Sequence, residues 1–222
     1  MSYKGITAGF QPVHESSILS TRFMKSDFVI STIGKKEAAQ LLLKYHYLKD
    51  HSKGFKSGYN YGLFRDEPIS AEGPLGVCIF TGLPVPELAQ SAFGLKRTEQ
   101  QGLFELSRLC LHPTPQSSER NLASWFVAKC LRKLRQSCEV RAVLSYADSD
   151  FHEGTIYRAS NFGYYGLSAP KKDFWIKQED GSFVKHSRGK ISGIEGEWRD
   201  RSRKHRYLMV YDKTLDVKWK KL

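Results

Sequence analysis

The chain has 222 residues with ordinary apolar and aromatic content and a formal net charge of +12. This length suits one α/β domain with a substantial core, and the composition excludes wholesale disorder. No apolar run is long enough for a membrane span and the N-terminus lacks a signal-peptide pattern, so we expect no membrane partner and a cytoplasmic protein.

The first quarter of the chain predicts an arm, a strand and a helix. Residues 1–25 look irregular, and 27–30 form a short apolar run typical of a strand. Ser31 or Thr32 is then expected to cap a helix that ends near His46. Its apolar face is Ala38, Leu41, Leu42 and Tyr45, at the spacing of an amphipathic helix. A polar, glycine-containing loop follows at 50–58.

The middle of the chain predicts a hairpin, a strand and a long helix. Two strand-like runs, 59–65 and 75–81, flank a turn-rich segment. Residues 82–102 are expected to be loop with at most a helical turn, and 104–111 alternate as a half-exposed strand does. Ser117 or Ser118 is expected to cap a helix that reaches about Gln136. Its inner stripe is Ala123, Val127, Cys130, Leu131 and Leu134.

The last third predicts the remainder of the sheet. A buried strand at 140–146, a helix at 152–161 and a strand at 162–167 come first. A basic insertion at 170–205 precedes the last strand, 207–211. We therefore expect one α/β domain over 1–222, with a mixed, mostly antiparallel central sheet that is flanked by helices. The four cysteines have no CxxC spacing, and we expect reduced thiols.

The positive charge is concentrated near the C-terminus. Residues 185–222 hold twelve Lys or Arg against five Asp or Glu, which is +7 of the net +12. Such a basic segment favours a polyanion partner, most simply DNA or RNA, although a solvated basic loop would have the same composition. The residues that we expect at DNA phosphates are Arg199, Arg201, Arg203, Lys204 and Arg206.

The most informative segment is the end of the strand at 140–146. It breaks at a polar cluster that contains Asp148 and His152, and a helix with Tyr157 follows. In open α/β sheets, functional groups gather beyond the carboxyl ends of strands. The alternatives are ordinary: Asp148 as a turn residue and Tyr157 as a core tyrosine. A metal site of His46, Asp148 and His152 is a weak candidate, because no ligand spacing supports it.

The element order and the segment GTIYRASNFGYYG, residues 154–166, resemble the GNAT acyltransferase fold. In that family a tyrosine on the late helix is often the general acid. One feature departs from it: the turn that usually holds the acyl-CoA pyrophosphate reads HPTPQSSER at 112–120, without glycine and with two prolines that cannot donate. Backbone amides at a helix N-terminus are what binds phosphate, so the departure puts ordinary acetyl-CoA binding in doubt.

A narrower resemblance is carried by four blocks: KYHY at 44–47, YNYGLF at 59–64, ELSRLCL at 105–111 and SYAD with H.GTIYRASNF at 145–162. Together they resemble the phage Mom DNA-modification proteins, divergent members of the same fold that place a carbamoylmethyl group on the exocyclic amine of adenine and so protect phage DNA from restriction. The resemblance implies His46, Tyr47, Arg108, Asp148 and Tyr157 as catalytic positions. The residues that we expect to bind the substrate are Tyr61, Ser107, Tyr146 and Asn161.

The resemblance leaves the donor and the partners open. A glycyl group would supply the two carbons and the nitrogen of the product, so glycyl-tRNA is favoured over acetyl-CoA, and iron has been invoked in mechanisms for the family. Double-stranded DNA is the expected partner, tRNA enters as a donor, and a homodimer is left open. The other functions considered are an ordinary acetyltransferase acting on a protein or small-molecule amine, and a non-catalytic basic DNA-binding module.

Overall fold

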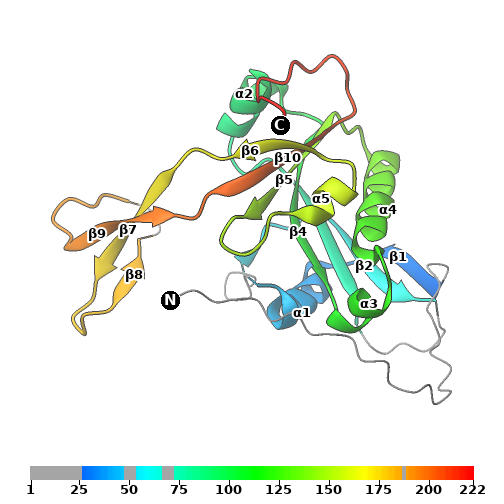
Figure 1. Cartoon of the computed structure of the whole chain (residues 1–222), viewed down its shortest axis with the longest axis horizontal. Coiled ribbons are helices and arrows are strands. Elements are labelled where there is room, and N and C mark those ends of the chain that lie inside the picture. Colours follow the sequence, from blue (N-terminus) through cyan, green and yellow to red (C-terminus); the bar gives the residue numbers. More distant parts are fainter. Residues whose placement is uncertain (1–26, 48–53, 67–72, 187–188) are drawn as a thin grey trace, which may run out of the picture.

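The computed structural model describes residues 27–47, 54–66, 73–186 and 189–222. They form a seven-stranded sheet in the order β1-β2-β3-β4-β5-β10-β6 and a separate three-stranded sheet in the order β8-β7-β9 (Figure 1). The irregular N-terminal segment predicted for 1–25 and residues 50–53 of the loop predicted for 50–58 lie outside the described residues. No helix in the described ranges is both long and apolar enough to cross a membrane.

The first half of the large sheet follows the predicted order. Strand β1 (Phe28–Thr32) pairs with β2 (Tyr59–Arg65), and β2 pairs with β3 (Gly76–Gly82), all antiparallel. Helix α1 (Lys35–Tyr45) buries Ala38, Leu41 and Leu42, as its periodicity predicts. The predicted cap is wrong, because Ser31 and Thr32 belong to β1. The helix begins after Gly34, whose N–H donates to the Glu37 carboxylate at 2.8 Å.

The middle of the chain is more helical than predicted. Residues 82–102, expected as loop, contain helix α2 (Glu87–Phe93) and the 3-10 helix η3 (Arg97–Glu99). Strand β4 (Leu103–Leu111) follows as predicted. Ser117 and Ser118 cap no helix, because they end the short α3 (Pro113–Ser118), and α4 (Leu122–Ser137) begins only after Asn121. The α4 stripe is buried as predicted, except that Ala123 is half-buried beside Leu122 and Phe126.

The second half of the sheet confirms the predicted mixed, mostly antiparallel class. Strand β5 (Ala142–Asp148) runs parallel to β4, and this is the one parallel pair among the described strands. Helix α5 (Thr155–Ala159) and strand β6 (Gly163–Leu167) follow. The last strand, β10 (Lys204–Val210), inserts between β5 and β6 and is antiparallel to both.

The basic insertion forms an arm rather than a loop. Strands β7 (Lys171–Lys177), β8 (Phe183–Lys185) and β9 (Gly196–Arg201) make the small sheet, which projects away from the body of the molecule (Figure 1). We call these three strands the arm. Its chain leaves the large sheet after β6 and returns at β10.

The helices cover both faces of the large sheet. Alternate residues of β5 point to opposite faces, so Val143 and Ala147 pack with α4, whereas Ala142 and Leu144 pack with α2. Helix α1 packs on β3 and β4, where Ile79 and Cys110 lie in the same cluster. All four cysteines are free, and three of them are buried.

Candidate functional site

The site begins where β4 and β5 separate. Their parallel pairing covers only Leu103–Leu106 against Ala142–Ser145, although β4 continues to Leu111 and β5 to Asp148. Beside this point, the register of β4 against β3 shifts at Ser107, which is left without a partner in the ladder. The bulge and the end of pairing open a split in the middle of the sheet, and bulges next to active sites re-aim side chains in this way.

A pocket of about 430 Å³ lies at this split. It is bounded by the end of α1, the second half of β4, α3 and the first turn of α4, β5 and the start of α5. Seven of the residues predicted for the site line it: His46, Tyr47, Ser107, Arg108, Tyr146, His152 and Tyr157. Three of the four sequence blocks therefore meet at one pocket, although they lie far apart along the chain.

His46 and Tyr47 form one wall. The His46 side chain is 7% exposed and stacks on Tyr47, with ring centroids 4.6 Å apart. Burial, helped by the positive charge of Arg108 and by His152, lowers the pKa of His46 to about 4. The imidazole is therefore neutral at pH 7, and this wall offers a flat aromatic surface with hydrogen-bonding nitrogens.

Tyr157 comes from α5, and a glycine brings it close to the sheet. Gly154 starts the helix at φ +75°, a conformation that L side chains rarely adopt. A Cβ there would lie 2.7 Å from the Tyr207 ring and 2.9 Å from that of Tyr157. Burial raises the pKa of the Tyr157 hydroxyl, and a hydrogen bond with Ser145 opposes this only in part. Tyr157 is therefore protonated and able to donate.

Arg108, Tyr146 and Glu105 form a polar group beside the bulge. Arg108 donates to the Ser107 carbonyl at 2.7 Å, whereas its Nε and the Tyr146 hydroxyl are buried without a partner among the described residues. Burial raises the pKa of Glu105, although Arg108 and Lys56 act against it. The sequence predicted no role for Glu105. Its place within the ELSR block was the one signal that could have identified it.

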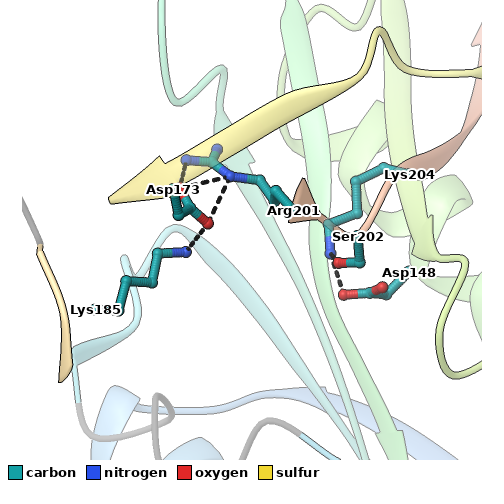
Figure 2. A network of polar contacts seen from close by, with 6 residues as sticks. All are labelled: Asp148, Asp173, Lys185, Arg201, Ser202 and Lys204. Atoms are coloured by element: carbon teal, nitrogen blue, oxygen red, sulfur yellow. Dashed lines mark hydrogen bonds and ion pairs between the residues drawn. The ribbon is translucent and has the colours of Figure 1, made fainter. Parts of the chain in front are cut away.

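Asp148 lies at the end of β5, as predicted, but it does not line the pocket. Its carboxylate forms an ion pair with Lys204 (Figure 2) and also accepts the Asp150 N–H. Burial would raise its pKa, but hydrogen bonds from Lys204, Ser202 and the Asp150 N–H outweigh this and hold the pKa of Asp148 below its usual range. Asp148 is therefore ionised and already bound on two sides.

His152 faces the pocket where Asp148 does not. Burial lowers its pKa, and the charge of Asp148 is the largest opposing effect. The weak metal site predicted from His46, Asp148 and His152 does not form, since the described residues contain no group of three or more His, Cys, Asp or Glu able to hold a metal ion. The sequence thus pointed to His152 for a role that the geometry does not provide.

Two predicted substrate-binding residues lie away from the pocket. Tyr61 is 3% exposed and packs in the core against Phe80, with ring centroids 6.2 Å apart. Asn161 adopts φ +66° in the turn that ends α5, and it lines a different cavity with Arg158 and Phe162. Their places in the sequence blocks reflect packing and chain reversal.

The five basic residues predicted at DNA phosphates all make contacts within the chain. Arg201 binds Asp173, and Lys204 binds Asp148, on either side of the turn from β9 to β10 (Figure 2). Arg199 pairs with Glu197 and lies over the Trp175 ring. Arg203 donates to the Ser168 carbonyl and Arg206 to the Tyr165 carbonyl, each at 2.7 Å. These side chains build the arm and attach it to the sheet.

Helix α4 carries a different basic surface. It contains Lys129, Arg132, Lys133 and Arg135 and no acidic residue. None of these four side chains belongs to an ion pair among the described residues.

Comparison with known proteins gives a family, together with solved structures of low sequence identity. Among solved structures, the ribosomal-protein-S18-alanine N-acetyltransferase from Escherichia coli is 10% identical and matches over 85% of this chain and 99% of its own, with a TM-score of 0.48. An acetyltransferase from Bacillus subtilis in complex with CoA is 12% identical and matches over 82% of this chain and 97% of its own, with a TM-score of 0.45. An N-acetyltransferase from Staphylococcus aureus Mu50 is 10% identical and matches over 83% of this chain and 98% of its own, with a TM-score of 0.44.

All three of these proteins are acetyltransferases. No curated protein sequence matches the chain. A family model does: the model of the Mom protein family matches residues 27–221. Since this match takes in nearly the whole sequence, the chain belongs to the Mom protein family.

Proposed function

We propose that this protein is a transferase that moves an acyl group to the exocyclic amine of adenine in double-stranded DNA, and that this acyl group is glycyl. The observation that carries the proposal is the pocket between β4 and β5, where three sequence blocks that resemble the Mom proteins supply its aromatic and polar walls. Its volume of about 430 Å³ is within the range of small-molecule sites and admits one base with the reacting end of a donor.

The acceptor chemistry needs a proton acceptor beside the amine. The adenine amine is a poor nucleophile, because its lone pair is delocalised into the ring, and it must lose a proton as the new bond forms. His152 is neutral and lines the pocket, so we assign it the role of accepting the proton from the adenine amine. The nearby charge of Asp148 favours the imidazolium that results, which makes Asp148 a positioning residue that acts through His152.

The base itself must leave the duplex to reach the pocket. Enzymes that act on a base take it out of the stack and hold it between aromatic side chains and polar partners. Tyr47, which is 43% exposed and stacked on His46, offers such a surface at the pocket.

We assign Tyr157 and Arg108 to the reaction of the acyl donor. Tyr157 is protonated and buried beside the split, so it can give its proton to the departing oxygen. Arg108 can stabilise the oxyanion that forms on the donor carbonyl, since its Nε has no partner among the described residues. Both groups reach the pocket from elements that are fixed by the core.

The turn before α4 favours a donor other than acyl-CoA. Two of its backbone amides are used within the chain: the Thr114 N–H donates to His112 Nδ1, and the Glu119 N–H donates to the Pro115 carbonyl. Amides engaged in this way do not form a phosphate cradle. Glycyl-tRNA supplies an activated acyl group without that cradle.

The atoms balance for a glycyl donor. The adenine nitrogen attacks the glycyl carbonyl carbon, the ester carbon–oxygen bond breaks, and the tRNA hydroxyl leaves with a proton from Tyr157. The free glycyl amine then attacks the ring carbon and forms a five-membered intermediate. When the original nitrogen leaves that carbon, the product is N6-carbamoylmethyladenine, with the original nitrogen now in the terminal amide.

Mass spectrometry of nucleosides from the DNA of expressing cells tests the acceptor. We expect a carbamoylmethylated adenosine with the wild-type protein, its loss with Tyr157→Phe, and its retention with Tyr211→Phe, which makes the same change at a tyrosine outside the pocket. An unmodified adenosine pool with the wild-type protein would refute the assignment. With purified protein and DNA, label should move from glycyl-tRNA, and transfer from acetyl-CoA alone would instead identify an ordinary acetyl donor.

A further inference from the structure

An aromatic series leads from the pocket to the surface. His46 stacks on Tyr47, and the Tyr47 ring contacts the Phe151 ring at a centroid distance of 4.9 Å and a tilt of 44°. The exposed fraction rises along the series from 7% to 43% to 60%. Phe151 is thus the most exposed aromatic side chain in the described ranges, and it lies at the rim of the pocket without lining it.

The surroundings of Phe151 indicate what it contacts. It lies in the turn between β5 and α5, next to the exposed carboxylates of Asp150 and Glu153. Carboxylates repel phosphates, so this turn is not suited to the DNA backbone. An exposed apolar ring is instead suited to the face of a base, and every base has such a face.

We propose that Phe151 is a wedge: it enters the duplex beside the target adenine and stacks on the bases that stay in the helix, while Tyr47 contacts the extruded base. The proposal rests on the proposed function and assigns a residue to the step before chemistry. Extrusion leaves a gap in the stack, and an apolar side chain that fills it stabilises the opened duplex. The order of exposure fits this division, since Tyr47 belongs to the pocket and Phe151 stands outside it.

A fluorescence experiment tests the wedge without any chemistry. Duplex DNA carrying 2-aminopurine in place of its adenines is mixed with the wild-type protein, Phe151→Ala or Phe151→Trp. Binding by the wild type and by the tryptophan variant should raise the fluorescence as the analogue leaves the stack. Phe151→Ala should bind with little rise, and because the side chain is 60% exposed the variant is expected to fold.

A modification assay separates opening of the duplex from the reaction. On paired DNA, Phe151→Ala should lose roughly tenfold or more in rate, the loss expected from removal of one base–aromatic stack. On DNA in which the same adenine lies opposite an abasic site, its rate should return to within about threefold of wild type, because an unpaired base needs less help to leave the helix. Val85→Ala, at another exposed apolar residue, is the control and should change neither rate.

The outcomes are distinct. If Phe151→Ala modifies paired DNA at the wild-type rate and raises the fluorescence equally, the wedge is overturned. An equal loss on paired and unpaired DNA overturns it too, because Phe151 would then contact the extruded base or another partner. If the wild type raises the fluorescence and Phe151→Ala does not, but the wild type modifies no DNA, the proposed function fails while the wedge stands.

Discussion

Gly154→Ala should be among the most destabilising single changes next to the pocket. The residue has φ +75°, and the left-handed region costs a non-glycine residue about 1–2 kcal/mol. The added Cβ would also lie 2.7 Å from the Tyr207 ring, 2.8 Å from the Ala147 Cβ and 2.9 Å from the Tyr157 ring. Overpacking of this kind adds about 1–3 kcal/mol, so we expect a total loss of about 2–5 kcal/mol in the free energy of unfolding.

Gly94→Ala separates the two contributions. Gly94 has φ +71° at the end of α2, but a Cβ there would meet only the flexible end of Lys218 at 3.4 Å. This variant should lose only the backbone cost, about 1–2 kcal/mol. Urea denaturation of both variants measures the difference. Equal losses, within about 0.5 kcal/mol, would refute the reasoning that Gly154 is required by crowding.

Three further predictions concern titration and ion pairs. Because the pKa of His46 is about 4 in the folded state and 6.5 ordinarily, the unfolded chain binds more protons than the folded chain between pH 4 and pH 6.5. The free energy of unfolding should therefore fall as the pH drops from 6.5 to 4. In urea titrations across this range, His46→Gln should make that fall shallower. Lys204→Met leaves the buried Asp148 carboxylate without its cation and should cost about 1–3 kcal/mol in urea, and adding Asp148→Asn should recover part of this loss; no recovery would mean that Lys204 acts through packing. Asp173→Asn removes the anion that pairs with Arg201 and Lys185 in the arm. Trypsin should therefore cleave the arm faster, while the midpoint of global unfolding stays unchanged.

Local periodicity predicted most of the large sheet. The alternation of 104–111 and the i, i+3, i+4, i+7 pattern of α1 are properties of a few neighbouring residues, and both elements are present. Helix boundaries were less predictable. Ser117 is a good capping residue, but two prolines nearby favour a separate short helix, and α4 starts instead after Asn121 in the left-handed conformation.

The site was predictable in outline and not in detail. The sequence blocks place His46, Arg108 and Tyr157 in one pocket, but no local pattern says that Asp148 turns towards Lys204, 56 residues later in the chain. The arm was missed for the same reason. Its strands are rich in charged residues, and they are held by pairing between distant segments and by the contacts of Asp173 with Arg201 and Lys185, which only the folded chain brings together.

The topology of the arm has a consequence for variation within the family. Strands β6 and β10 are antiparallel neighbours in the large sheet, so the arm is in effect a very long hairpin connection. Such a connection can be shortened, lengthened or exchanged without changing the strand order around the pocket. The first residue of β10 limits such changes, because Lys204 at that position forms the ion pair with Asp148. We expect arms of different length to be interchangeable as modules, provided that each returns to the sheet with a cation at that position.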